Sequence, residues 1–339
     1  MGAGTARGGA CLLISGNVRK NMEFVVFAGV LLLLFIFMIV QELIQTKNQE
    51  KLFKKYLREN YGKEPPKEYS LERFARLGSY LERHKEEKQL DDITWNDLGM
   101  DEVFRRIDRT YSAAGEEYLY YTLRNISCGR EAMEHLEEVV NWLQEQEDIK
   151  VRIQLLMKRL GHLGKYSLYD YLDNLDYLGE RSNRKIVLGN LLYLPFLLLL
   201  FVQPAMGTIG IVLCMLWHIM TYFREKKVIE PYIISFAYVL RLIDVCEELE
   251  KQKIPVYRRE LDELREVLKS LRELRRGSYW VMAGNQGKIG GNPLDILADY
   301  LRMILHLDIF QFNRMLEKLR KKTGQVETML AITGYLDMA

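Results

Sequence analysis

Three long apolar runs constrain the fold of this 339-residue chain more than any other feature. The first run is Phe24–Val40, and the other two are Ile186–Val202 and Ala205–Phe223, with only Gln203 and Pro204 between them. A helix needs ~20 apolar residues to cross the ~30 Å hydrocarbon layer of a membrane. The first run, extended by flanking apolar residues to 22–44, therefore predicts an N-terminal span. The second and third runs predict a membrane-spanning helical hairpin, because the link between them is too short for anything else.

Basic residues indicate how these spans are oriented. They cluster at both outer ends of the hairpin and are absent from its tip, so the positive-inside rule places the ends in the cytoplasm. Lysines also follow the first run in excess, which places its C-terminal side in the cytoplasm. We therefore expect a multi-pass protein of the cell membrane, with its helical parts in the cytoplasm. The alternative is a hairpin buried in a soluble core, but soluble domains seldom bury two adjacent helices that are apolar all round. The basic residues at the hairpin are Arg181, Arg184, Lys185, Arg224, Lys226 and Lys227.

Composition excludes several classes of site. The net charge of +2 gives no support for a nucleic-acid partner, although a balanced total does not exclude one. The four cysteines are scattered and no histidine stands at metal-ligand spacing, so neither a disulfide framework nor a zinc site is predicted. These cysteines are Cys11, Cys128, Cys214 and Cys246.

The soluble segments carry helical patterns and predict an all-α fold. Ser70 can cap a helix that runs to about His84, and Thr94 followed by Asp97 resembles a capping box. Beyond the hairpin, the pattern predicts two helices, or one long helix kinked near Pro255. Their bounds are Pro231–Glu250 and Pro255–Arg276, and leucines 261, 264, 268 and 271 form an apolar seam on the second.

The glycine-dense segment Gly277–Asn292 invites comparison with a phosphate-binding loop. It lacks the G-x-x-x-x-G-K-[ST] spacing, and Ile289 follows Lys288 where a magnesium-binding hydroxyl is required. The sequence also shows no convincing nucleophile–base pair and no cluster of carboxylates. We therefore expect this chain to be non-catalytic, with no catalytic, cofactor-binding or metal-binding residues and no cofactor of its own.

The segment Leu90–Leu123 contains the most specific motif. Its spacing follows Arg-Thr-x-(Ser/Thr)-Ala-x-Gly-x-x-x-Leu, and this pattern resembles the opening of the core domain in MutS-type DNA mismatch repair ATPases. The chain departs from the family at Glu116 and Glu117, where basic residues are usual, and it lacks the tryptophan-leucine and proline that normally follow. The resemblance is therefore to a distant branch. The matching residues are Arg109, Thr110, Ser112, Ala113, Gly115 and Leu119.

This resemblance implies a helical core with lever helices. The complete protein would be a homodimeric ATPase that couples its nucleotide state to lever movement and grips duplex DNA. ATP and magnesium would bind an ATPase domain that is missing here, and the chain ends within a predicted helix as if truncated before that domain. The alternative is a membrane scaffold that binds protein partners through its cytoplasmic helices. A transporter is disfavoured, because the three apolar runs contain no Asp, Glu, Lys or Arg, and His218 near the end of the third run is their one histidine.

The predicted organisation has six parts, which are an N-terminal extension (1–21), a transmembrane anchor (22–44), a linker (45–69), the first part of the helical core (70–185), the transmembrane hairpin (186–223) and the second part of the core and lever (224–339). Within the motif, Gly115 costs helix stability, so we expect it to permit close approach of a neighbouring helix. On that basis Gly115→Ala should be nearly neutral and Gly115→Leu destabilising.

Overall fold

The computed structural model describes Leu33 and residues 36–63, 67–85, 88–126, 129–164, 166–275 and 293–339. These residues are helical and form no strand beyond one isolated bridge between Gln89 and Asn125, so the all-α prediction is confirmed for them. The chain divides into two units. One comprises Met1–Tyr56 with Lys288–Ala298, and the other comprises Leu57–Gly287 with Asp299–Ala339.

Three predicted features fall largely or wholly outside the described residues. The N-terminal extension (1–21) and the glycine-dense segment Gly277–Asn292 lie wholly there, and so does most of the predicted N-terminal span at 22–44. Residues 36–59 form a helix, and Gly62 then adopts a positive φ of 72°. The helix therefore continues beyond the predicted span, into the predicted linker, and ends near Gly62.

The large unit begins with four short helices: α2 (Leu71–Arg76), α3 (Gly78–Arg83), α4 (Asp92–Asp97) and α5 (Met100–Ile107). The Ser70 side chain caps α2 as predicted, accepting a hydrogen bond from the Arg73 amide at 3.2 Å. The single helix expected up to His84 is divided at Leu77. The capping box predicted at Thr94 is wrong, because Asp91 caps α4 by accepting from the Thr94 amide at 2.7 Å.

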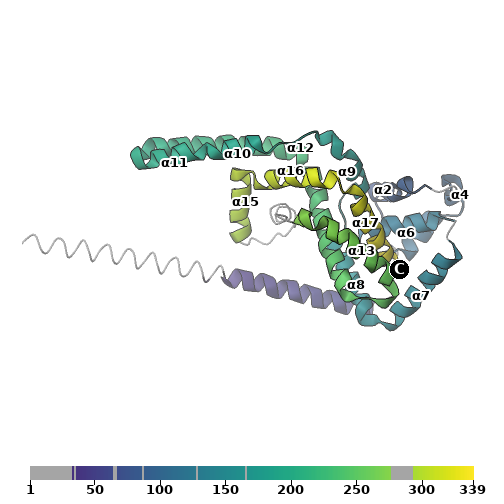
Figure 1. Ribbon diagram of the computed structural model, residues 1–339. Helices are drawn as coiled ribbons and strands as arrows, with labels where there is room; N and C mark the ends of the chain where they lie inside the picture. The colour runs from purple at the N-terminus through teal and green to yellow at the C-terminus, as the bar shows by residue number, and fades with distance from the viewer. Residues whose placement is uncertain are drawn as a thin grey trace, which may run out of the picture. The chain divides into compact units, whose positions relative to one another are not determined.

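A bundle of longer helices forms the core (Figure 1). Helix α6 packs along α17, and α12 contacts α8, α13 and α17. Leucines 261, 264, 268 and 271 of α13 are all buried, so the predicted seam is confirmed. The remaining bounds are α6 (Ala113–Arg124), α7 (Arg130–Glu145), α8 (Glu147–Leu160), α9 (Leu168–Asp173), η1 (Asn174–Leu178), η2 (Pro255–Tyr257), α13 (Arg258–Leu271), η3 (Arg272–Arg275), α15 (Pro293–Leu305), α16 (Leu307–Arg320) and α17 (Thr323–Met338).

The apolar hairpin consists of α10 (Arg184–Leu191), α11 (Tyr193–Val202) and the first half of α12 (Pro204–Gln252). The first arm is interrupted at Leu192, within one turn before Pro195, where the proline ring disfavours continuous helix. Helix α12 has 49 residues and is about 74 Å long at 1.5 Å per residue. The prediction of a new helix beginning at Pro231 is wrong. Pro231 is exposed, so solvent can satisfy the carbonyl that the proline leaves unpaired.

Small residues bring the two hairpin arms together. A side chain on Gly207 would lie 2.6 Å from the Leu200 backbone nitrogen, and one on Gly210 would overlap the Phe196 ring. Both glycines are buried, and so are Cys214 and His218 further along the same face of α12. Close backbone approach through small residues is typical of paired helices in membranes.

The outward faces of the hairpin are apolar and exposed. Leu198 is 69% exposed, Phe201 90% and Met220 73%. Among the residues that the structure describes, two helical stretches are long and apolar enough to cross a membrane, Arg184–Val202 and Pro204–Gln252. Only 6% of the apolar window in the first is buried, and 28% of that in the second. The apolar faces of the hairpin are therefore largely not covered by the described helical bundle.

Candidate functional site around the start of helix α6

The motif residues surround the first turn of α6. Ser112 is the N-cap, and its Oγ accepts a hydrogen bond from the Gly115 amide at 3.1 Å. Thr110 donates its hydroxyl to Asp108 at 2.7 Å. The Ala113 amide donates to the Gly161 carbonyl at 3.0 Å, which ties the helix start to the end of α8. The six residues therefore lie in one local region, and their contacts within it are structural.

The two outermost motif residues extend this region in opposite directions. Arg109 donates to the carbonyl of the preceding Asp108 at 2.9 Å. Leu119 lies near the middle of α6 and is buried in a small apolar cluster with Trp95 and Phe104. Leu119 therefore attaches α6 to the layer formed by α4 and α5.

Asp337 of α17 joins two distant parts of the chain at this point. Its carboxylate accepts from the Ser112 amide at 2.8 Å, from the Ser112 hydroxyl at 2.6 Å and from the Tyr111 amide at 3.1 Å. The carboxylate thus occupies the positive end of the α6 dipole. Burial raises the pKa of Asp337 to about 6, while the hydrogen bonds from Ser112 and Tyr111 act in the opposite direction.

Glycines on both helices make this contact possible. A side-chain carbon on Gly115 would lie 2.7 Å from Cγ of Asp337. On the facing helix, a side-chain carbon on Gly334 would lie 2.6 Å from the Ala114 carbonyl oxygen. The close approach expected at Gly115 is therefore present, although the atoms that it meets belong to a side chain and not to a backbone.

Glu116 lies at the centre of a buried network of ion pairs. Its carboxylate is fully buried and contacts Arg76 at 2.9 Å, His162 at 2.8 Å and the Arg73 guanidinium. Burial by itself would raise the pKa of Glu116, but His162 and Arg73 outweigh it and lower the pKa to about 2. Glu116 is therefore ionised at neutral pH and holds α2 and the end of α8 against α6.

Glu117, the next residue, has the opposite protonation state. Burial raises its pKa to about 8, and the Ser167 hydroxyl donates to its carboxylate at 2.9 Å. Glu117 is therefore protonated at neutral pH, next to an ionised neighbour. Glu116 and Glu117 are the two positions at which the motif departs from its family pattern, and both serve as buried structural groups here.

The carboxyl cluster that sequence reasoning did not find consists of Asp108, Glu116, Glu117 and Asp337. Asp108 is fully buried and pairs with Lys67 at 2.9 Å. The four groups are held by guanidinium, ammonium, hydroxyl and amide donors. Within the described residues, no His, Cys, Asp and Glu side chains are grouped so that they could hold a metal ion. The cluster therefore acts as a polar joint between helices.

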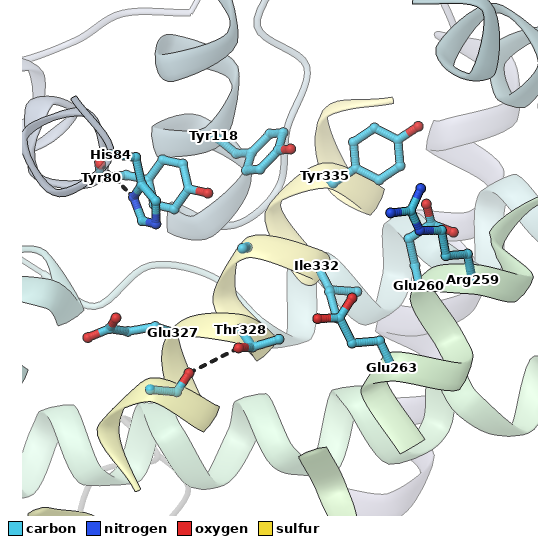
Figure 2. A pocket seen from close by; sticks show the side chains of 12 residues that line it. Tyr80, His84, Tyr118, Arg259, Glu260, Glu263, Glu327, Thr328, Ile332 and Tyr335 are labelled. Carbon is cyan, nitrogen blue, oxygen red and sulfur yellow. Dashed lines mark hydrogen bonds between the residues drawn. The ribbon is translucent and has the colours of Figure 1, made fainter. Parts of the chain in front are cut away.

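A hollow of about 450 Å³ opens near this joint, between α3, α6, α13 and α17 (Figure 2). Tyr80 and the adjoining His84 lie on one side, and Tyr118 and Tyr335 extend from α6 and α17. Carboxylates of α13 and α17 complete the lining, among them Glu260. No local sequence pattern predicts this hollow, because its walls come from four separate segments.

Comparison of the chain with protein-family models, with curated proteins and with solved structures found no match. The function is therefore inferred from the chemistry and geometry of the chain itself.

Proposed function

We propose that this chain is a non-catalytic, membrane-anchored helical core and lever region of a MutS-like protein. On this proposal, an ATPase domain outside the chain binds ATP and magnesium, and the complete protein is a homodimer that grips duplex DNA. The helical hairpin lies in the cell membrane, and the bundle around α6 lies in the cytoplasm. The MutS part of the proposal is supported by the motif from Arg109 to Leu119.

The continuity of α12 is the observation that carries this proposal. Its first half bears exposed apolar side chains such as Leu213 and Met220, whereas most residues of its second half from Ser235 to Leu249 are buried. A single continuous helix therefore passes from the apolar hairpin into the bundle (Figure 1). A movement of the core helices would be transmitted along α12 to the hairpin, which is the function of a lever.

Polar contacts secure the base of the hairpin to the bundle. The Tyr222 hydroxyl donates to Asp308 at 2.8 Å, and Asn183 donates to the Phe310 carbonyl at 3.0 Å. Arg181 pairs with Glu225 across the two arms. These contacts support a lever whose two arms move with α16 as one body.

Membrane insertion is tested by extraction and cysteine labelling. The full chain, expressed in cells, should stay with the membrane fraction in alkaline carbonate. A single cysteine introduced at Gln203, on a background with the native cysteines removed, should react with an impermeant maleimide from outside. Cysteines at Lys88 or Lys269 should not react. Labelling of either cytoplasmic position in intact cells, or release of the chain by carbonate, would contradict the proposed topology.

DNA binding separates the lever proposal from the alternative of a membrane scaffold. The detergent-solubilised chain should bind duplex DNA with an affinity that falls as salt rises, because contacts to phosphates release counterions. The scaffold alternative predicts capture of a protein partner and no affinity for duplex DNA. Absence of DNA binding at low salt would therefore remove the DNA-gripping part of the proposal and leave the membrane part intact.

A further inference from the structure

Four exposed basic side chains at the base of the hairpin have no acidic partner among the described residues. Arg184 and Lys185 are the first two residues of α10, and Arg224 and Lys227 lie on α12. Lys269 of α13, by comparison, pairs with a carboxylate one turn away at 2.6 Å. The charge of the four residues is therefore available to a ligand outside the chain.

Two contacts between the hairpin arms place these four residues at one level. Arg181 pairs with Glu225, and a side chain on Gly189 would lie 3.1 Å from Nε2 of His218. The two basic residues of α10 lie between these contacts on the first arm, and Arg224 lies between them on the second. The fourth residue follows Glu225 by two positions, which is about 3 Å along a helix. The four residues therefore form one narrow basic band.

Other charges near the band neutralise each other and not the band. The segments 181–185 and 224–227 contain six basic residues. Of these, Arg181 pairs with Glu225. Lys226 donates to the Tyr222 hydroxyl at 3.1 Å, and that hydroxyl donates to the buried Asp308, so the ammonium and this carboxylate offset each other. The four residues of the basic band are left without opposing charge.

Exposed apolar side chains continue from the basic band along both arms. On α12, Arg224 follows Met220 by four positions and Trp217 by seven, a spacing that places all three on one face of the helix. Met220 is 73% exposed and Trp217 51% exposed. On α10, Leu188 follows Arg184 by four positions and is 68% exposed. Each arm therefore offers an apolar stripe that ends in a cation, which is the pattern that a phospholipid matches with its acyl chain and its phosphate.

We propose that the basic band binds the phosphate of an anionic phospholipid in the cytoplasmic leaflet. Guanidinium and ammonium groups form strong charge-assisted hydrogen bonds with phosphate oxygens, and basic clusters next to membrane spans attract anionic lipids. The acyl chains of the lipid lie along the exposed stripe at Met220. This proposal rests on the proposed insertion of the hairpin in the membrane, and it adds the class of lipid that the hairpin selects.

The test uses the full chain reconstituted in phosphatidylcholine vesicles and the fluorescence of Trp217. Brominated acyl chains quench a tryptophan that they contact, and the quenching that is lost in Trp217→Phe belongs to Trp217. Brominated phosphatidylglycerol and brominated phosphatidylcholine are compared at equal mole fraction. Phosphatidylglycerol should be enriched at Trp217 by about fivefold or more, the factor that one Lys or Arg contributes at an anionic surface.

Variants locate the lipid site. The double variant Arg224→Gln, Lys227→Gln should lose most of the preference for phosphatidylglycerol, while brominated phosphatidylcholine should quench it as in the parent. The matched control Arg130→Gln, Lys269→Gln removes two exposed bundle cations that are paired with carboxylates, and it should keep the preference.

The outcomes separate this proposal from the proposed membrane insertion. Equal quenching by the two lipids in the parent, or an unchanged preference in the Arg224 and Lys227 double variant, would overturn the lipid site and leave the insertion intact. Quenching by neither lipid would overturn both. Loss of the preference in millimolar glycerol phosphate at constant ionic strength would assign the basic band to a soluble anion and would also overturn the lipid site.

Discussion

Replacement of Gly115 by alanine tests the packing of α6 against α17 most directly. The new side-chain carbon would lie 2.7 Å from Cγ of Asp337 and 2.8 Å from its Cβ, which is far inside van der Waals contact. Helix propensity would gain roughly 1 kcal/mol. Overpacking costs about 1–3 kcal/mol, and displacement of the Asp337 carboxylate weakens hydrogen bonds worth about 1 kcal/mol each.

The cost of overpacking and of weakened hydrogen bonds exceeds the gain in helix propensity, so the parent should be more stable than the alanine variant. We expect Gly115→Ala to lower the free energy of unfolding by about 2 kcal/mol, and Gly115→Leu to lower it by more than about 3 kcal/mol. The sequence alone predicted near neutrality for alanine, because it did not reveal the carboxylate opposite the glycine. The structure therefore replaces that expectation with a clear loss of stability.

The measurement is urea unfolding of the full chain in dodecyl maltoside, followed by circular dichroism. Helix α17 must be present, so a fragment ending before it would not report this contact. Gly78→Ala is the matched control, because a side chain there meets nothing within 4 Å and should leave stability equal or slightly higher. In an Asp337→Gly background, Gly115→Ala should lose its cost, because the atoms that it meets are gone. An equal cost in both backgrounds, or a Gly115→Ala variant as stable as the parent, would refute this reasoning.

Three further substitutions test the remaining contacts. Glu117→Gln should remove a pH dependence: the folded pKa of about 8 lies above the ordinary value of 4.5, so the stability supplied by this proton is complete below pH 4.5 and lost as pH rises through 8. The difference in free energy of unfolding between parent and variant should change by about 1.4 kcal/mol per pH unit. Urea unfolding at pH 5.5, 6.5 and 7.5 measures it. A difference that stays constant over this range would contradict the prediction. Ser112→Ala removes the N-cap and a donor to Asp337 and should cost about 1–2 kcal/mol in the same assay, whereas no change would mean that the cap is not formed. Gly207→Leu should separate the hairpin arms, because its side chain would meet Leu200, and a cysteine pair placed across the arms should then cross-link less efficiently than in the parent; unchanged cross-linking would contradict the close approach.

Local sequence patterns predicted local structure well. The hairpin, the Ser70 cap and the leucine seam of α13 follow from spacing alone, because each depends on residues within a few turns of one another. Predictions of helix ends were wrong where two residues could each cap the same helix, or where an exposed proline was tolerated inside a helix. Asp91 caps α4 in place of Thr94, and α12 continues through the exposed Pro231.

The candidate site was only half predictable, for the same reason. The motif identified the first turn of α6 and the tight position at Gly115. Asp337, Gly334 and the partners of Glu116 lie on other helices, and no local pattern distinguishes them from ordinary surface residues. The groups that decide the protonation states of this site could therefore not be predicted, because they are far from the motif along the chain.

The joint and the hairpin are linked through helices that already share buried contacts. Helix α17 carries Asp337 at one end and packs against α12, where Cys246 meets Thr333 at 3.4 Å. A shift of α17 along α6 would have to break the hydrogen bonds of Asp337 and would press on α12 at Cys246. Because α12 is one continuous helix as far as the hairpin, such a shift would reach the apolar arms without any flexible connection between. Gly115 and Gly334 permit the close approach of α17 to α6, so a larger side chain at either position should displace α17 against α12 as well as lower stability.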